Sequence, residues 1–289
     1  MDHVILTRFN LPSPGRERKI RDQPGWLESR VELFERFCLP SVVAQTDSRL
    51  RWIIYFDPAS PAWLQHRAES HRAAELYVPL FREQVSREEL LEDIRRVVGP
   101  ASSELMTTNL DNDDALAKDF CERLRSEPPP PRTTAYYFVN GLIRGAEGLY
   151  VQHDPDNAFP SVRSPWDLAI TCWSEWHTLL RRSMPVVEIA GAPGWLQVVH
   201  DRNVSNRTHG RLVTPPAYAG LFPGLLDDLI EPSRAALWRD RLLGRPARGA
   251  RDGTVRLLKP ALVRVLGRSG PDRIRQVSAR LRRLMSARG

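Results

Sequence analysis

Cysteine is scarce in this sequence, and no two of its cysteines are close together. The three residues, Cys38, Cys121 and Cys172, form no Cys-x-x-Cys pair, which argues against a zinc knuckle and a disulfide framework. No apolar run approaches the roughly 20 residues that span a bilayer. The first residues also lack the basic and apolar regions of a secretory signal. Together these absences predict a protein of the reducing cytoplasm.

Several catalytic signatures are missing as well. The chain has no Gly-x-Ser-x-Gly elbow, no glycine-rich phosphate loop with lysine and no dinucleotide-binding fingerprint, which argues against the common hydrolases, NTPases and dehydrogenases. What is present is an ordinary globular composition, with 42% hydrophobic and 27% charged residues in 289. A chain of this length and composition buries a core without help from disulfides or a structural metal.

Positive charge is concentrated at one end of the chain. Residues 233–289 carry a net charge of +13, whereas residues 1–232 carry −6, within a total of +7. This shift predicts a boundary between a folded domain, 1–232, and a basic extension, 233–289, in which we expect helices near 254–267 and 272–287. Because the excess charge is not spread over the domain, a nucleic-acid partner is not expected.

The first 125 residues alternate between strand-like and helix-like segments. Apolar runs predict strands at 3–9, 51–56, 76–81 and 105–110. Helical periodicity predicts helices at 26–45, from Pro61 to about 75, after Ser86 and at 115–125. This alternation predicts an α/β fold with a parallel, doubly wound sheet. Further along, 134–139 and 148–152 are predicted as an antiparallel pair around a turn, with strands at 168–173 and 195–200.

A cluster of carboxylates follows the fourth predicted strand. Asp111, Asp113 and Asp114 fall within four positions, where their mutual repulsion favours a bound cation. Oxygen ligands suit Mg²⁺ or Mn²⁺, and ligands bind at the carboxyl ends of strands in open α/β sheets. The alternative is that Asp113 or Asp114 merely caps a helix that begins near Ala115.

Other segments complete a pattern with this acidic run. They are His3–Asn10, Leu33–Gln45 with Trp52–Asp57, Asn109–Asp114, and Trp195–His200 with Asn203–Asn206. In this order, over about residues 3–210, they resemble the rhamnosyltransferase family of bacterial, metal-dependent GT-A glycosyltransferases. The resemblance implies a single GT-A domain, a Rossmann-like α/β fold that binds nucleotide-diphospho-sugars. It also implies a nucleoside-diphosphate sugar donor and a divalent metal, Mn²⁺ or Mg²⁺, as cofactor.

The resemblance further implies roles for individual residues. The residues implied to bind the nucleotide sugar are Thr7, Arg8, Asn10, Asp57, Asn109, Asp111 and Asn112. Those implied to bind the metal are Asp111, Asp113 and His200. Family members often carry arginine where this chain has Asn109. More ordinary alternatives stay open for Arg8 as a surface residue, Asp57 as the start of a turn and His200 as a strand-end histidine.

An inverting transferase needs a base that takes the proton of the acceptor hydroxyl. We look for this base in 126–232, the expected acceptor half, which follows a nucleotide-sugar half, 1–125. Glu175 and Asp154 are the predicted candidates, with Asp156 and His177 as alternatives. Glu175 is preferred because burial among the aromatic side chains around it favours proton uptake by a carboxylate. Asp154 lies in a segment whose composition also suits an ordinary turn.

The sequence thus predicts a cytoplasmic glycosyltransferase that transfers a sugar to a glycan or lipid-linked acceptor. The competing interpretation is a non-catalytic binding or scaffold protein on the same fold, docked to a membrane or an acidic partner by its tail. Residues 272–287 place an apolar stripe between arginines, which suits an anionic surface on the inner face of the membrane. A helix packed on the acidic body is the alternative for this segment.

Overall fold

The structure is a computed structural model that describes residues 1–12, 21, 23–146, 148–200, 208–246 and 248. The chain divides into two compact units, Met1–Pro232 and Ser233–Gly289, at the point where its net charge changes sign. None of the helices in the described part has the length and apolarity needed to cross a bilayer. The helices predicted at 254–267 and 272–287 lie outside the described residues.

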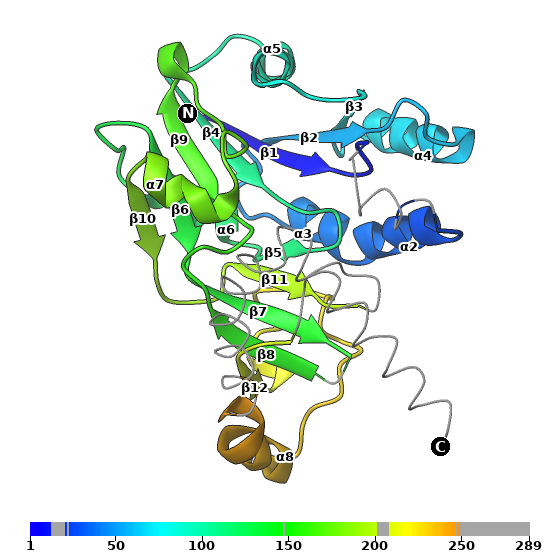
Figure 1. Cartoon of the computed structure of the whole chain (residues 1–289), viewed down its shortest axis with the longest axis vertical. Coiled ribbons are helices and arrows are strands. Elements are labelled where there is room, and N and C mark those ends of the chain that lie inside the picture. The colour runs from blue at the N-terminus through cyan, green and yellow to red at the C-terminus, as the bar shows by residue number, and fades with distance from the viewer. Residues whose placement is uncertain (13–20, 22, 147, 201–207, 247, 249–289) are drawn as a thin grey trace, which may run out of the picture. The chain divides into compact units, whose positions relative to one another are not determined.

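The larger of two sheets in the first unit carries the chain's alternating first half. Within the described residues it has seven strands in the order β10-β6-β9-β4-β1-β2-β3, and Figure 1 shows them side by side. Strands β1, β2, β3 and β4 run parallel, whereas β9 runs antiparallel to both of its neighbours. The bounds of these strands are β1 (Asp2–Arg8), β2 (Arg51–Phe56), β3 (Val78–Phe81), β4 (Glu104–Asn109), β6 (Thr134–Phe138), β9 (Ser161–Pro165) and β10 (Val186–Ile189).

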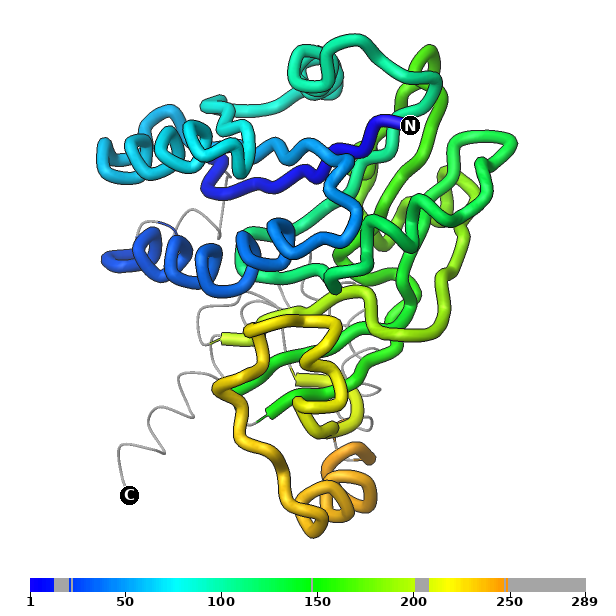
Figure 2. The backbone as a smooth tube through the Cα atoms, turned by 180° about the vertical axis from the view of Figure 1, so that it is seen from behind, coloured from blue at the N-terminus to red at the C-terminus, as the bar shows by residue number. Residues whose placement is uncertain are grey.

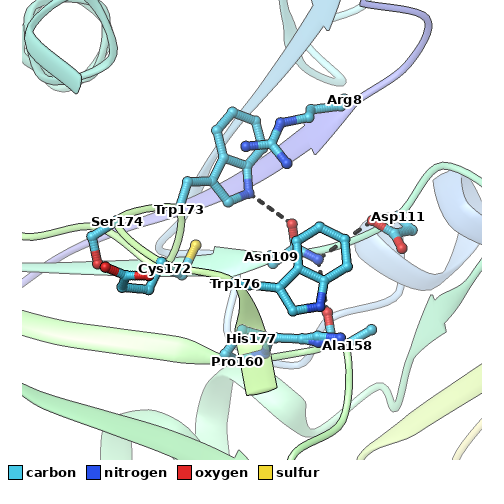
Figure 3. Close-up of a pocket in the computed structure, with 11 residues that line it drawn as sticks. Arg8, Asn109, Asp111, Ala158, Pro160, Cys172, Trp173, Ser174, Trp176 and His177 are labelled. Carbon is cyan, nitrogen blue, oxygen red and sulfur yellow. Dashed lines mark hydrogen bonds between the residues drawn. The ribbon is translucent and has the colours of Figure 1, made fainter. Parts of the chain in front are cut away.

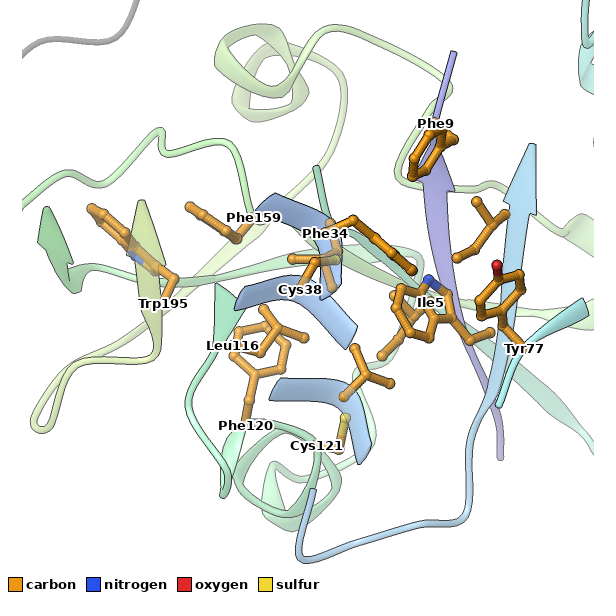
Figure 4. Packing of buried hydrophobic residues seen from close by; sticks show 14 of the residues in the cluster. Ile5, Phe9, Phe34, Cys38, Tyr77, Leu116, Phe120, Cys121, Phe159 and Trp195 are labelled. Carbon is orange, nitrogen blue, oxygen red and sulfur yellow. The ribbon is translucent and has the colours of Figure 1, made fainter. Parts of the chain in front are cut away.

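Successive residues of a strand point to opposite faces of the sheet. Because both faces of this sheet carry apolar side chains, helices cover both. Ile5 of β1 packs into the hydrophobic core on one face of the sheet (Figure 4). Its neighbours Val4 and Leu6 pack into a second core on the opposite face, beneath α5. The long helical segment at 26–43 lies along the sheet, as Figure 2 shows from behind. The helices and helical turns of the first half are α2 (Trp26–Leu33), a π-helical turn (Phe34–Cys38), α3 (Leu39–Val43), α4 (Ala62–Ala73), α5 (Arg87–Val98) and α6 (Phe120–Ser126).

These elements confirm the α/β class and most of the predicted first half. The predicted helix at 26–45 is present as consecutive helical segments that end at Val43. The predicted start after Ser86 is a full capping box, in which the Ser86 and Glu89 side chains each bond the other residue's backbone N–H. Such caps satisfy two of the backbone donors that a helix leaves unpaired at its start.

A second, smaller sheet comes mostly from the later part of the chain. Its order is β12-β8-β7-β11-β5. Gly141 in β7 lies against the indole of Trp195, and a Cβ at Gly141 would come within 2.0 Å of that ring, so only glycine fits there. The strands are β5 (Ala115–Leu116), β7 (Asn140–Gly145), β8 (Gly148–His153), β11 (Trp195–Val198) and β12 (Arg211–Val213).

Short helices connect or follow these strands. In the first unit they are the 3₁₀ turns Trp166–Leu168, His177–Leu179 and Pro215–Ala217, with α7 (Leu180–Ser183). In the second unit the described helices are α8 (Arg234–Arg239) and a π-helical turn, Asp240–Gly244.

Three predictions for the later elements were wrong. The helix predicted at 115–125 begins only at Phe120, because Ala115 and Leu116 pair with β11 as a strand; neither Asp113 nor Asp114 therefore caps it. The strand at 148–153 pairs with β7 and β12, not with 134–138, which joins the larger sheet. Within 168–173 the structure has a 3₁₀ turn and irregular backbone rather than a strand.

Candidate functional site

The polar residues predicted to bind ligand gather at one edge of the larger sheet. Strand β1 lies between β2 and β4, and all three are parallel, so their carboxyl ends meet at the same edge. Arg8 and Asn10, Asp57, and the run 109–114 follow these three strand ends. This is the place where open α/β sheets bind their ligands. The topology therefore brings together residues that are about 100 positions apart in the chain.

Thr7 stabilises this edge of the sheet through hydrogen bonds made by its buried side chain. Its hydroxyl donates to the Leu110 carbonyl at 2.8 Å and accepts from the indole N–H of Trp52 at 3.0 Å. The Thr7 side chain is fully buried. It therefore fixes the start of the acidic run against β1 and has no surface with which to touch a ligand.

Asn10 and Asp57 form a second fixed corner. The Asn10 amide accepts from the Asp57 backbone N–H at 3.0 Å and donates to the Ser60 hydroxyl at 2.9 Å. The Asp57 carboxylate accepts from the Ala59 backbone N–H at 2.8 Å and pairs with Arg21 at 3.3 Å. Asp57 starts a turn, as the alternative interpretation expected, and also presents a partly exposed carboxylate beside β1.

Asp113 lies at the centre of the acidic run with two basic partners. Its Oδ2 accepts from the Arg30 guanidinium of α2 and lies 3.0 Å from the His200 Nε2. Burial opposes ionisation of Asp113, but the hydrogen bonds and charges of His200 and Arg30 outweigh burial and lower the pKa of this carboxyl. Asp113 is therefore an ionised, 6%-exposed carboxylate.

The smaller sheet explains why His200 reaches Asp113. Strand β5 directly follows the acidic run and pairs with β11, in the register Leu196 to Ala115. The Asp114 carboxylate then accepts the backbone N–H of Val198 at 2.8 Å, which places His200, two residues on, beside Asp113. Burial is the main reason that the pKa of Asp114 is raised, and the negative charges of Asp113 and Asp111 raise it further.

Asn112 and Asp111 complete the run. The Asn112 amide donates to the Phe9 carbonyl at 2.5 Å and accepts from Arg30 at 3.2 Å, so it ties the run to β1 and α2. The protein atoms packed around Asp111, together with the charge of Asp113, raise the pKa of Asp111 to about 6. Asp111 is nevertheless exposed to solvent, and water therefore screens much of this effect.

The predicted metal ligands are assembled only in part. In the described residues no group of three or more His, Cys, Asp and Glu side chains is arranged to hold a metal ion. Asp113 and His200 nevertheless have the right mutual geometry, since neighbouring ligands of an octahedral ion with bonds near 2.1 Å are roughly 3 Å apart. The two side chains therefore fit a divalent ion as a pair, with the third predicted ligand, Asp111, nearby in the run.

Beside this edge is a pocket of about 400 Å³, drawn in Figure 3. One wall comes from strand ends, with Arg8, Asn109 and Asp111, and another comes from the segment 172–177. That segment is anchored to β4, because the Cys172 backbone N–H donates to the Thr107 hydroxyl at 2.8 Å. Ala158 and Pro160, which precede β9, also line the pocket, because β9 is antiparallel and starts beside the end of β4.

Trp173 joins the two walls. Its indole N–H donates to the Asn109 side chain at 2.7 Å, and the Arg8 guanidinium lies over its ring, 4.0 Å from the centroid; both contacts are visible in Figure 3. Asn109 in turn donates to the Ala158 carbonyl at 2.7 Å. Arg8 is exposed, as the alternative interpretation expected, and the Trp173 ring beneath its guanidinium holds it at the pocket.

The candidate bases are placed differently. Glu175 lines the pocket but is exposed, so the burial among aromatic side chains that was expected for it is not present. Asp154 is not among the lining residues, and its carboxylate accepts the Asp156 backbone N–H at 3.1 Å as part of a turn. His177 lines the pocket, and burial lowers the pKa of its ring despite the opposing charges of Asp154 and Asp156.

Two functional-site residues were not found from the sequence. Arg30 is one of two arginines in the helical segment 26–43, and nothing local distinguishes it from the other, Arg36. Trp173 is one of eight tryptophans, for which core packing is the commoner use. Only their positions opposite Asp113 and Arg8 identify them.

The family comparison covers most of the chain. A family model described as "Putative rhamnosyl transferase" matches residues 2–212, which confirms the resemblance predicted from the sequence. No curated protein sequence matches the chain.

Several solved structures are similar to part of this chain at low sequence identity. The chain is similar to S. aureus TarS at 9% identity and a TM-score of 0.40, with 69% of this chain and only 37% of that chain covered. S. aureus TarS 1–349 in complex with UDP is similar at 11% identity and a TM-score of 0.40, with 69% of this chain and 61% of that chain covered. A "putative nucleotide-diphospho-sugar transferase" of Desulfovibrio desulfuricans G20 is similar at 11% identity and a TM-score of 0.33, with 70% of this chain and 83% of that chain covered.

Proposed function

The chain belongs to this rhamnosyl transferase family and is a glycosyltransferase, and we propose that it transfers a sugar from a nucleoside-diphosphate donor to a glycan or lipid-linked acceptor with the help of a divalent metal. The observation that carries the proposal is the pairing of Asp113 with His200 at the edge where β1, β2 and β4 end. The adjoining pocket supplies room for a sugar beside that edge.

The metal part of the proposal is supported by the donor set. Asp113 and His200 would hold Mn²⁺ or Mg²⁺, and Asp111 would contribute from the same run. The bound ion would stabilise the charge that develops on the departing diphosphate. Two or three protein ligands leave coordination positions open for phosphate oxygens, as is usual for metal–nucleotide sites.

The remaining side chains at this edge suit a nucleotide sugar. The partly exposed carboxylate of Asp57 would accept hydrogen bonds from the ribose or base. Arg8, held by the ring of Trp173, would offer a guanidinium to the diphosphate or the sugar. Asn109 and Asn112 are both bonded to neighbouring backbone carbonyls, so their main role would be to keep this wall in place.

The reaction also needs a group on the acceptor side. For an inverting transfer, the Glu175 carboxylate would take the proton of the acceptor hydroxyl as the hydroxyl oxygen bonds to the anomeric carbon. The bond from that carbon to the diphosphate breaks at the same time, and the diphosphate leaves with the bonding electrons. Glu175 is favoured over Asp154 because it lines the pocket.

A panel of sugar nucleotides, including activated rhamnose, tests the proposal. We expect one donor to raise the melting temperature in the presence of Mn²⁺ and to be hydrolysed slowly without acceptor, and both effects to vanish with a chelator. A scaffold protein on the same fold would show no metal-dependent hydrolysis of any donor, which would contradict the proposal.

We also propose that the basic extension docks the enzyme on an anionic membrane surface. The described start of the extension exposes Trp238, Leu242 and Leu243 between arginines, a combination that suits a lipid interface. Each basic residue near such a surface contributes about 1 kcal/mol. Deleting residues 233–289, the whole second unit, should abolish sedimentation with anionic vesicles at low salt and leave donor hydrolysis intact. Equal sedimentation of both proteins would contradict this proposal.

A further inference from the structure

Arg30 forms a largely buried ion pair with the acidic run. Its guanidinium donates to the Asp113 Oδ2 and, at 3.2 Å, to the Asn112 side chain. The Arg30 and Asp113 side chains are only 13% and 8% exposed. The indole of Trp26, one helical turn earlier, lies 5.4 Å from the same guanidinium. Arg30 is therefore held in place on three sides.

We propose that Arg30 is a built-in cation that competes with the divalent metal for Asp113. The inference rests on the proposed function, because it takes Asp113 and His200 as ligands of that metal. It makes Arg30 a positioning residue that controls when the carboxylate is available.

The competition follows from a shared oxygen. The Asp113 Oδ2 that accepts from Arg30 is the same atom that lies 3.0 Å from His200. A divalent ion bound between Asp113 and His200 would thus lie within a few ångströms of the guanidinium. Two cations at that distance in a poorly solvated site repel each other strongly, so Arg30 has to turn away from Asp113 when the ion binds.

The Arg30–Asp113 ion pair also stabilises the site when no metal is bound. Three carboxylates stand within four positions, and a buried carboxylate without a cationic partner is costly. Arg30 lowers that cost, because its guanidinium pairs directly with Asp113 and also donates to the neighbouring Asn112. When a donor diphosphate arrives, the displaced guanidinium gains a new anionic partner, which suits its fork of N–H groups.

Removing the charge of Arg30 should therefore have two opposite effects. The affinity for free Mn²⁺ should rise, on the order of tenfold, because the competing cation is gone. The KM for the donor should rise at saturating Mn²⁺, because the diphosphate loses a counter-charge. A residue with a purely structural role would instead weaken both kinds of binding.

The test is a titration of the full-length protein with Mn²⁺ alone, in which free Mn²⁺ is measured by electron paramagnetic resonance. Arg30→Gln is the first variant, and Arg30→Met, which keeps the stem beside Trp26, is a second neutral variant if the first fails to fold. Arg36→Gln is the matched control, because Arg36 lies on the same helical segment and pairs with the exposed Asp228. The control should bind Mn²⁺ as the wild type does.

Unchanged or weaker Mn²⁺ binding in the folded Arg30 variants would overturn the inference. If the wild type binds Mn²⁺ and Asp113→Asn loses that binding, the proposed metal site stands even when the Arg30 variants show no gain. If neither the wild type nor the Arg30 variants bind Mn²⁺, and transfer survives a chelator, the metal part of the proposed function fails together with the inference.

Discussion

The two walls of the pocket differ in how firmly they are held. The acidic run after β4 reaches the pocket through Asn109 and the exposed Asp111, and its next residues, Asn112, Asp113 and Asp114, are hydrogen-bonded and only 1–6% exposed. The opposite wall, 172–177, is anchored through Cys172 but ends in exposed side chains, with Trp176 at 64% exposure. The acidic run, which we call the fixed wall, is thus the more buried of the two, and the segment 172–177, which we call the exposed wall, offers more side-chain surface to solvent.

This difference suits the tasks of a sugar transferase. Stabilising charge on a diphosphate works best with groups already in position, since no reorganisation is then needed during the reaction. Acceptors vary from one enzyme to another, and exposed loop residues on a rigid scaffold are where such specificity usually resides. Substitutions in the fixed wall should therefore lower the transfer rate most. Substitutions in the exposed wall should change kcat and the KM for the donor independently of each other.

The largest effect is expected at the centre of the fixed wall. Asp113→Asn should lower the transfer rate on the order of 10²-fold or more, because a charged ligand for the metal is lost. Transfer and Mn²⁺-dependent donor binding are measured on protein whose circular dichroism matches the wild type. Asp119→Asn, a partly exposed partner of Arg123, is the control and should remain active. Near-normal turnover by Asp113→Asn would refute the assignment.

On the exposed wall, Glu175→Gln should reduce kcat by about 10²-fold with little change in the KM for the donor, because general bases contribute at least this much. Asp154→Asn should change kcat far less, since Asp154 is not among the pocket-lining residues. Steady-state kinetics of both variants decide the matter. The reverse ranking would transfer the role of base to Asp154.

A smaller effect is expected where the walls are joined. Trp173→Phe keeps a ring beneath Arg8 but removes the N–H that donates to Asn109. The loss of one such bond costs about 1 kcal/mol, so the KM for the donor should rise severalfold. Trp173→Ala removes both contacts and should raise this KM further. Equal kinetics for the two variants would show that Trp173 does not hold Arg8 in place.

The smallest effect is expected at Asp228, which pairs with Arg144 of the smaller sheet and with Arg36. Hydrogen bonds from Arg144, aided by Arg36 and opposed by partial burial, lower the pKa of Asp228 to about 2. A lowered pKa in the folded state adds stability at neutral pH that is lost as the pH falls from about 4 towards 2. Because Asp228 is half exposed, Asp228→Asn should cost only about 1 kcal/mol at pH 7. Urea unfolding should show this difference shrinking below pH 4, and a constant difference would contradict the assignment.

Strand ends, caps and local periodicity made the first half predictable. Apolar runs of the right length marked β1, β2 and β4, and the polar residues after each run marked the ligand-binding edge. The later half was harder, because its strands pair with distant segments rather than with their neighbours. Strand β9 pairs with β4 and β6, and β5 pairs with β11, and nothing in the local sequence specifies those partners.

The sequence by itself determined the α/β class, the parallel direction of the first strands and the identity of the acidic run, because these depend on local patterns of apolar and charged residues. Only the tertiary structure decided which groups face that run. Arg30 reaches Asp113 because α2 packs beside β1, and His200 reaches it because two residues of β5 pair with β11. Contacts of this kind depend on packing between segments more than 80 residues apart, where spacing along the chain carries no information about distance in space.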